Sequence, residues 1–437
     1  MNDVSHAVSG REPTNGSDEK ITDYSKRVLA YGFFPGLQQV RAFASVAELG
    51  RISQAAIELN LSQSAIAQAI ATLESDLGAL LFERRNKGSY LTKIGNILKQ
   101  RTGLFFERMR EALGEFVNTN ASIADIELNM LCRRITKAQI LALIAIKESG
   151  SFIQAARHAG VSQPAIHRSA RTLEENLGSK IFHVTAQGAT TNERGSLLAD
   201  RLHLAIREFE WAYEEVQAEK GLVRGRILVG GLLLAGSPFL ATALSKFTAA
   251  YPDANIDITN GSYDALLYML RTGSIDFIVG LLKNPPPSDD VVEAFLATDP
   301  YVIAVRKGHP LANKANVSRE QLAQYDWVLP GPTAARRASF EKLFEDLPSP
   351  PRANIKTHSF TIILMLLAES DSMTILTESQ LCLDRRFGHN LTALKFKLPE
   401  PSASIGVTMR KKWLPTHLQE NFLQSLKSAA EHPASAQ

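Results

Sequence analysis

Two stretches of the chain carry amide and guanidinium side chains at helical spacing, a pattern that suits the reading of DNA bases. Glutamine pairs with adenine, arginine pairs with guanine or phosphate, and alanine fits the thymine methyl group. On the first predicted helix, the exposed side presents Ser62, Gln63, Ser64, Ala67 and Gln68. On the second, it presents Ser162, Gln163, Pro164, His167, Arg168 and Arg171. Both faces predict contacts in the major groove. For either helix alone, the alternative is a solvated face.

A basic ribbon follows the first of these helices. Residues 83–90 predict two short strands with a turn at Asn86–Gly88, and the basic residues near its tip are Arg84, Arg85 and Lys87. Positive side chains there would attract phosphate groups. The second ribbon has Val184, Thr185 and Gln187 at the corresponding positions. We therefore expect the two copies to contribute unequally to DNA binding.

Both helices belong to a tandem repeat. Residues 37–101 recur as residues 137–201 without a gap, and 21 of the 65 aligned positions are identical by direct count. Each copy predicts a helix, a short second helix that ends at Asn60 or Gly160, and a third helix capped by Ser62 or Ser162. The third helix of the first copy buries one apolar stripe, formed by Ile66, Ile70, Leu73 and Leu77. Two helix-turn-helix units are predicted.

A long helix is predicted after each ribbon, at about Lys93–Val117 and Glu193–Ala218. Each carries an apolar stripe, and paired stripes on long helices indicate helix association rather than a cofactor pocket. The stripe residues are Leu98, Phe105, Met109 and Leu113 in the first helix, and Leu197, Leu198, Leu202, Ile206 and Phe209 in the second.

From Gly225 the pattern alternates between strands and helices, which predicts an open parallel sheet. Strands are expected at 226–230, 255–260 and 275–281, with a second set at 301–306, 327–329, 354–357 and 373–377 and a return to the first set at 403–409. Ligands bind such sheets outside the carboxyl ends of the strands, where helix N-termini offer N–H groups.

The loops at those ends supply the candidate ligand-binding residues. They are Gly231, Leu232, Ser237, Gly261, Ser262, Pro332, Thr333, Arg336, Ser359, Phe360, Thr361 and Thr377. Their hydroxyls and backbone amides suit a carboxylate, and Arg336 or Arg337 would add a bidentate clamp. The alternative is that the serines and threonines only cap helices and the arginines face water.

The repeat closely resembles the DNA-binding domain of LysR-type transcriptional regulators. The first copy carries QAA at 54–56, LSQSAI at 61–66 and LFER at 81–84, and the second carries VSQPAI at 161–166. Residues 225–437 resemble the effector domain of the same family through RILVG at 226–230, DFIVG at 276–280 and GHPL at 308–311. The chain departs from the family in having two copies, and in having Ala67 and His167 where a serine is usual.

The resemblance implies a multidomain protein with two all-α winged helix-turn-helix domains and an α/β effector domain. That domain is a two-lobed fold like the type-two periplasmic-binding proteins. The expected segments are a flexible tail at 1–33, the two winged domains with their linker helices at 34–120 and 121–224, and the effector domain at 225–437. Lobe I is expected at 225–300 and 389–437, and lobe II at 301–388.

Promoter DNA and a small anionic effector, an aromatic or sugar acid, are the partners that the resemblance implies. It also implies linker helices that pair subunits into a dimer or tetramer, with RNA polymerase as a further candidate partner. Two rival interpretations stay open. In one, a single winged helix binds DNA and the other serves assembly. In the other, the chain is a solute-binding protein with vestigial helices.

Composition excludes several other classes of protein. The net charge is +3, no apolar run would cross a bilayer, and the N-terminus lacks a secretory signal, so we expect a cytoplasmic protein without membrane contact. Cys132 and Cys382 are too far apart in sequence to form a metal knuckle. No HExxH, GxSxG or Walker motif occurs. We therefore expect no enzymatic activity, metal or cofactor.

Overall fold

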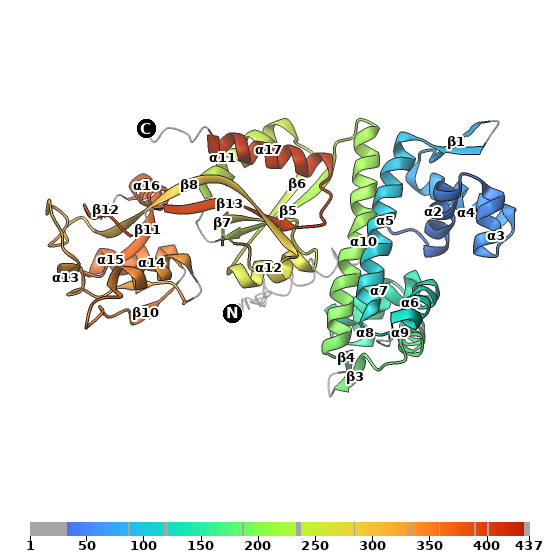
Figure 1. Cartoon of the computed structure of the whole chain (residues 1–437), viewed down its shortest axis with the longest axis horizontal. Coiled ribbons are helices and arrows are strands. Elements are labelled where there is room, and N and C mark those ends of the chain that lie inside the picture. Colours follow the sequence, from blue (N-terminus) through green and yellow to red (C-terminus); the bar gives the residue numbers. More distant parts are fainter. Residues whose placement is uncertain are drawn as a thin grey trace, which may run out of the picture. The chain divides into compact units, whose positions relative to one another are not determined.

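The chain forms two compact units, residues Met1–Val216 and Gln217–Gln437 (Figure 1). The computed structural model describes residues 33–85, 88–117, 121–185, 188–232, 237–283, 285–332, 334–357, 359–388, 390–399 and 402–431. The expected tail therefore lies outside the described residues, except for Phe33. Each unit is described in turn.

The first unit contains both copies of the repeat. The first copy comprises α2 (Leu37–Leu49), α3 (Ile52–Leu59), α4 (Gln63–Leu77), β1 (Phe82–Arg85), β2 (Gly88–Leu91) and α5 (Lys93–Gly114). The second comprises α7 (Lys137–Ser149), α8 (Phe152–Ala159), α9 (Gln163–Leu177), β3 (Phe182–Thr185), β4 (Gly188–Thr191) and α10 (Glu193–Glu219). Helix α6 (Ala121–Arg134) connects them. The two predicted winged helix-turn-helix folds are confirmed.

Corresponding residues of the two copies make the same contacts with the backbone. Glu74 accepts hydrogen bonds from the amides of Leu81 and Phe82, and Glu174 does the same for Ile181 and Phe182. These carboxylates connect α4 and α9 to the ribbons that follow them. The turn before each of these helices also follows the prediction, since Asn60 and Gly160 both adopt the left-handed conformation, with φ of 54° and 65°.

Helices α4 and α9 begin differently. Ser62 caps α4 as expected, because its Oγ accepts the amide of Ala65 at 3.1 Å. Ser162 occupies the same position before α9, but its side chain makes no capping hydrogen bond. The amide of Ala165 is bonded instead to the Ser162 carbonyl oxygen at 3.0 Å, and Pro164 has no N–H to offer. The predicted side-chain cap is therefore wrong for the second copy.

Both copies share one hydrophobic core, which includes residues of α2, α4, α5, α7, α9 and α10. Helices α5 and α10 pack along each other in opposite directions, because the start of α5 is bonded to the end of α10 and the reverse also holds (Figure 1). The apolar stripes predicted to pair two subunits are thus buried within one chain. Leu197 is the exception, since 40% of it is exposed.

The second unit is built on one large sheet whose strands follow the order β11–β8–β13–β7–β5–β6, with β12 also paired to β8. The strands are β5 (Gly225–Leu232), β6 (Ala254–Gly261), β7 (Phe277–Leu281), β8 (Val291–Arg306), β11 (Thr374–Thr377), β12 (Leu391–Ala393) and β13 (Ser402–Arg410). Strands β5, β6 and β7 are parallel as predicted, but β13 is antiparallel to both β7 and β8. The sheet is therefore mixed.

Helices cover both parts of this sheet. They are α11 (Ser237–Ala250), α12 (Tyr263–Arg271) and α17 (His417–Glu431) around the first strands, and α13 (Arg319–Leu322), α14 (Ala335–Phe344), α15 (Phe360–Glu369) and α16 (Glu378–Phe387) around the second set. A small parallel pair, β9 (Val328–Leu329) and β10 (Ile355–Lys356), completes the second set.

Strand β8 passes from one lobe to the other. It pairs with β13 up to Pro300 and with β11 from Tyr301 onward. The segment after His389 was expected in lobe I, but Leu391 packs in a core with Val328 and Leu367, on the lobe II side. Because β12 is hydrogen-bonded to the end of β8, the chain returns to the first lobe later than predicted, with β13.

Candidate DNA-reading faces and effector site

Helix α4 keeps a polar face exposed while its opposite face is buried. Ser62, Gln63, Ser64 and Gln68 are exposed, and Ala67 is half-buried. The apolar stripe of the same helix is buried, as predicted from Ile66, Ile70, Leu73 and Leu77. The Gln68 amide lies 3.5 Å from the Thr72 hydroxyl. The face expected to read bases is therefore accessible in this unit.

Helix α9 presents the corresponding face with different chemistry. Its exposed residues are Ser162, Gln163, Pro164, His167, Arg168 and Arg171. Arg171 forms an ion pair of 3.3 Å with Glu175, and the His167 ring lies 5.0 Å from the Phe152 ring. In the described part of the chain, Arg168 has no ion-pair partner. Arg168 is thus the cation on this face that is most available to an incoming ligand.

The ribbons pair as predicted, from Phe82 opposite Leu91 to Arg85 opposite Gly88 in the first copy. The side chains of Arg84 and Arg85, and the whole of Lys87, lie outside what the structure describes. The corresponding residues of the second copy, Val184, Thr185 and Gln187, have undescribed side chains as well. The difference in charge between the ribbons therefore remains a prediction from sequence.

The two reading helices lie toward opposite ends of the long-helix pair (Figure 1). Each reading helix and its ribbon directly precede the start of a long helix, α5 or α10. Since the long helices are antiparallel, these starts lie at opposite ends. In the first copy, Lys99 of α5 donates a hydrogen bond to the Ala47 carbonyl oxygen of α2. In the second copy, Lys147 of α7 forms an ion pair with Asp200 of α10. The two helix-turn-helix copies are thereby attached to one pair of long helices.

Three of the candidate effector residues cap helices. The hydroxyl oxygens of Ser262, Ser359 and Thr377 accept the amides of Ala265, Ile362 and Gln380, at the starts of α12, α15 and α16. Ser359 is half-buried and Thr377 is buried, whereas Ser262 is exposed. Their side chains thus perform the capping role that was the alternative to ligand contact. The helix N-termini that they cap do follow strand ends, as expected.

The predicted clamp Arg336 is buried inside lobe II. Its Nη1 donates to the Ile375 carbonyl and to Oε1 of Gln380, both at 3.3 Å. Burial lowers the pKa of its guanidinium. These bonds join α14 to β11 and α16, so the structure gives Arg336 a structural role and does not favour the clamp.

The remaining candidates differ in how accessible they are. Gly231 is buried, Leu232, Gly261 and Phe360 are half-buried, and Pro332 and Thr361 are exposed. Thr333 and the Ser237 side chain lie outside the described residues. These positions remain predictions, because no contact among the described residues brings them together around one cavity.

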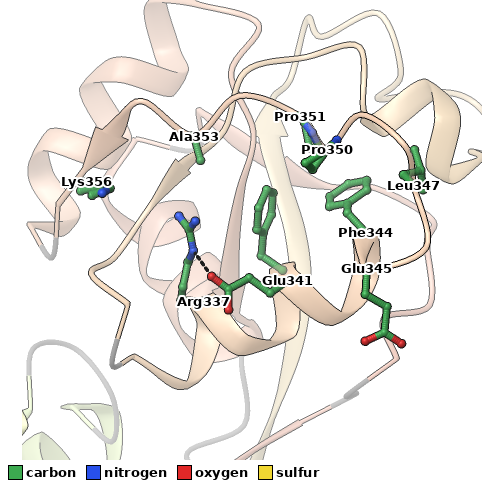
Figure 2. Close-up of a pocket in the computed structure, with 10 residues that line it drawn as sticks. Arg337, Glu341, Phe344, Glu345, Leu347, Pro350, Pro351, Ala353 and Lys356 are labelled. Carbon is green, nitrogen blue, oxygen red and sulfur yellow. Dashed lines mark hydrogen bonds and ion pairs between the residues drawn. The ribbon is translucent and has the colours of Figure 1, made fainter.

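A cavity that the sequence did not indicate lies beside α14 (Figure 2). Its volume is about 430 Å³, and its walls come from α14 and from the segment that leads to β10. Arg337 and Glu341 form an ion pair of 2.8 Å at its edge, and Phe340 and Phe344 form an apolar wall. No sequence motif marks it, because its lining is an ordinary amphipathic helix face and a proline-containing loop.

Comparison with known proteins follows the same division of the chain. Residues 37–96 and 138–196 each match the family described as bacterial regulatory helix-turn-helix protein, lysR family, and residues 220–431 match the LysR substrate binding domain. The chain belongs to the LysR family of transcriptional regulators. As a LysR regulator it is a DNA-binding protein with an effector-binding domain, and not an enzyme.

Named relatives agree with this assignment. The HTH-type transcriptional regulator GalR of Pseudomonas putida is 29% identical over 377 residues, which are 86% of this chain and 92% of the relative. CfxR of Cupriavidus necator is 26% identical over 60% of this chain and 81% of its own length. The fold is similar to that of a full-length OxyR variant from Pseudomonas aeruginosa, with a TM-score of 0.51 and 19% identity over 66% of this chain and 97% of that chain.

Neither a metal site nor a membrane span is found in this LysR regulator where the structure describes it. Within the described ranges, no group of three or more His, Cys, Asp or Glu residues is placed to hold a metal ion. None of the described helices is both long and apolar enough to span a membrane.

Proposed function

We propose that this LysR regulator contacts promoter DNA with both of its winged helix-turn-helix copies. The observation that carries the proposal is that α4 and α9 both bury an apolar stripe and both leave their polar faces exposed. A helix with one free face of amide, hydroxyl and guanidinium groups fits the major groove. Neither face is covered by other described residues of the first unit, which is what a reader requires.

We further propose that a small anionic effector, an aromatic or sugar acid, binds in the second unit. The support is that α12 in one lobe and α15 and α16 in the other begin at strand ends, where N–H groups and the helix dipole favour negative charge. Such an effector changes transcription only if it binds one arrangement of the regulator more tightly than another. We propose that the regulator forms homo-oligomers and that the effector changes how their subunits are arranged. We also propose RNA polymerase as the partner that responds to this change.

Gel-shift titration of the full chain tests the DNA proposal. The probe is the duplex upstream of the regulator's own gene, and the titration is repeated between about 50 and 200 mM salt. We expect a shift whose logarithmic affinity falls linearly with the logarithm of the salt concentration, because bound lysines and arginines release counterions from phosphate. Absence of any shift at the lowest salt concentration would refute the proposal.

Variants separate the two readers in the same assay. Gln63→Ala with Gln68→Ala weakens the first reader, and Arg168→Ala weakens the second. If both copies contact DNA, each variant binds more weakly than the wild type. If one copy serves assembly only, the variant of that copy retains wild-type affinity, and the proposal gives way to the regulator with a single reader.

A panel of aromatic and sugar acids tests the effector proposal. The full chain is heated in the presence of each acid, because a ligand that binds only the folded state raises the melting temperature with its concentration. We expect at least one carboxylic acid to raise the melting temperature, whereas its methyl ester does not. If no acid does so at millimolar concentration, the effector class is wrong.

A further inference from the structure

The ion pairs between α5 and α10 are reciprocal. Arg101 is bonded to Glu215 at 2.7 Å, and Arg201 is bonded to Glu115 at 2.7 Å. Because the repeat has a displacement of 100 residues, Arg101 corresponds to Arg201 and Glu115 corresponds to Glu215. A contact from i to j together with the contact from j to i is the mark of a two-fold axis. The two copies within one chain are therefore arranged like the two subunits of a symmetric dimer.

The residues on this axis are Arg108 and Glu208. They correspond when the displacement of 100 residues is extended along the long helices, and their side chains form an ion pair of 3.0 Å between Nε and Oε1. In a pair of identical helices, a residue on the axis meets its own copy. Two α5 helices would thus bring Arg108 against Arg108, and two α10 helices would bring Glu208 against Glu208.

Because the residues on the axis are buried, the free energy of the helix pair depends strongly on whether their charges are opposite or alike. Glu208 has no exposed side-chain surface, and it accepts a second bond, from Nη1 of the fully buried Arg101, at 3.0 Å. A buried carboxylate without cations, or two buried cations without a carboxylate, is strongly unfavourable. The α5–α10 pair places one carboxylate between Arg101 and Arg108. An α5–α5 pair would gather both copies of these arginines at the axis without a carboxylate there, and an α10–α10 pair would bring two Glu208 carboxylates together, each with only Arg201 as a cation. Like charges on the axis therefore act against pairing of two identical linker helices.

Aromatic packing next to the axis is also specific to the mixed pair. The Phe105 and Phe209 rings lie 4.8 Å apart, and the Phe34 ring packs against both of them at 6.3 Å and 5.8 Å. The residues at the equivalent positions of the other copy are Ala205 and Met109. The aromatic cluster therefore forms once, on one side of the axis, and needs both helices.

We infer that the α5–α10 pair of one chain takes the place of a two-subunit DNA-binding unit, and that its ligand is a duplex with two unlike half-sites. This inference rests on the proposed DNA contacts of both readers. A symmetric pair of identical readers requires a palindrome. Here the axis is kept but the reading faces differ, with Gln63, Ala67 and Gln68 on one and His167 and Arg168 on the other.

The chemistry of the two faces identifies the half-sites. Amide and methyl groups on α4 favour A·T pairs, and the guanidinium on α9 favours guanine. The starts of α5 and α10, Lys93 and Glu193, each lie 15 residues before the axis positions 108 and 208. At a rise of ~1.5 Å per residue, the two starts are roughly 45 Å apart along the pair. One turn of duplex measures about 34–36 Å, so a single chain has the length to reach two neighbouring major grooves on one side of the duplex.

Crosslinking tests the intrachain pair without DNA. In a full chain with Cys132 and Cys382 replaced by serine, cysteines are introduced as Glu115→Cys and Arg201→Cys and treated with a short bismaleimide. Both sites are partly exposed, at 44% and 40% of their side chains, so the reagent has access and the core is left intact. We expect a crosslinked monomer on a denaturing gel. A crosslinked dimer would show that the helices pair between chains and would overturn the inference.

Footprinting tests the unlike half-sites on the operator that the wild type protects. At saturating protein, Gln63→Ala with Gln68→Ala is expected to lose protection over one half-site, and Arg168→Ala over the other. If both variants lose the same half-site, or if either still protects both, the inference is wrong. Failure of the wild type to bind any upstream DNA would instead refute the proposed function and leave the crosslinking result standing.

Discussion

At the scale of single residues, removal of the Arg168 side chain tests whether α9 contacts bases or only attracts phosphate groups. It is exposed on α9, whereas its neighbour Arg171 is tied to Glu175 at 3.3 Å. A good bidentate contact to a base contributes about 1–3 kcal/mol of discrimination. We expect Arg168→Ala to weaken binding to the operator roughly 5- to 150-fold, measured by gel shift at constant salt.

Arg171→Ala is the matched control for that substitution. It removes the same charge from the same helix, but its guanidinium is already paired, so we expect a smaller loss of affinity. Equal losses for the two variants would mean that α9 attracts phosphate without reading bases. Unchanged binding of Arg168→Ala would remove the second copy from the DNA interface.

Arg336 offers a second test at this scale. Because its guanidinium donates to Ile375 and Gln380 inside lobe II, we expect Arg336→Met to lower the free energy of unfolding of the effector domain by about 1.5–3 kcal/mol. Differential scanning fluorimetry of the full chain measures this. Arg337→Met removes an i,i+4 ion pair with Glu341, and we expect a smaller loss from it. A weaker response to an acid ligand with unchanged stability would restore the clamp role of Arg336.

Sequence reasoning identified which side chains of α4 and α9 are exposed, apart from the half-buried Ala67, because helical periodicity fixes which side chains share a face. It did not identify the burial of Arg336, because the oxygens that receive its hydrogen bonds come from residues 39 and 44 positions away. The missing cap at Ser162 was not predicted either, because the amide of Ala165, equivalent to the one that Ser62 accepts, is bonded to the Ser162 carbonyl oxygen instead. In both cases the bonding partner is not specified by periodicity.

At the scale of elements, two glycines fix how each ribbon meets its long helix. A Cβ on Gly95 would lie 2.2 Å from the Leu81 carbonyl oxygen, and one on Gly195 would lie 2.4 Å from that of Ile181. Real side chains do not approach so closely, so the ribbon or the helix has to shift. We expect Gly95→Ala to destabilise the first copy by about 1–3 kcal/mol, the usual cost of overpacking, measured by urea unfolding of the full chain.

Gly103 provides the control because it lies in the same helix. Nothing approaches its Cβ position within 4 Å, so Gly103→Ala adds a methyl group without a clash. Alanine also favours helix over glycine by about 0.8–1 kcal/mol. We therefore expect Gly103→Ala to stabilise the protein slightly. Destabilisation by both substitutions alike would contradict the close contact at Gly95.

The axis between the long helices gives a further prediction about elements. Glu208→Ala leaves Arg101 and Arg108 without the carboxylate that pairs with both, and breaking a buried pair in this way costs about 3–5 kcal/mol. Glu115→Ala removes one member of a partly exposed pair, for which about 0–1 kcal/mol is usual. Chemical unfolding followed by circular dichroism compares the two. Similar values would mean that Glu208 is not the centre of the pair.

Strand β8 was predicted only in part. Only residues 301–306 were predicted, whereas the strand runs from Val291 to Arg306. Its first part pairs with β13 alone and contains Glu293, Asp299 and Pro300, so its burial does not alternate regularly. The direction of β13 was also undetermined, because its partner strands lie more than 100 residues earlier in the chain. Local sequence patterns do not predict which distant segments pair as strands.

At the scale of the whole molecule, the apolar stripes predicted that the long helices associate, and the family resemblance implied pairing between subunits, whereas the structure pairs the two helices within one chain. An apolar stripe shows that a helix has a partner, whereas the identity of that partner depends on charges that meet only after folding. Arg108 and Glu208 are 100 residues apart, and the importance of their pairing is apparent only when the axis is known. If both copies contact DNA, joining them in one chain makes the second contact an intramolecular one.

That arrangement predicts how binding depends on the spacing of the half-sites. An insertion of about 5 base pairs between them rotates one half-site by about half a turn, since a turn contains ~10–10.5 base pairs. A fixed pair of readers then reaches only one half-site. We expect the affinity to fall to that of a probe with one half-site mutated. This loss is up to roughly 10²- to 10⁴-fold, the range that linked binding contributes.

An insertion of a full turn, about 10 base pairs, distinguishes a fixed pair from flexible readers. This insertion returns both half-sites to the same side of the duplex but moves them about 34 Å farther apart. The α5–α10 pair cannot span the added distance because its length is set by the two helices. We therefore expect affinity to remain low for this probe, measured by gel shift beside the half-turn insertion. Recovery of full affinity with the full-turn insertion would mean that the half-sites are read by separately mobile domains or by different chains, since only independent readers tolerate a whole added turn.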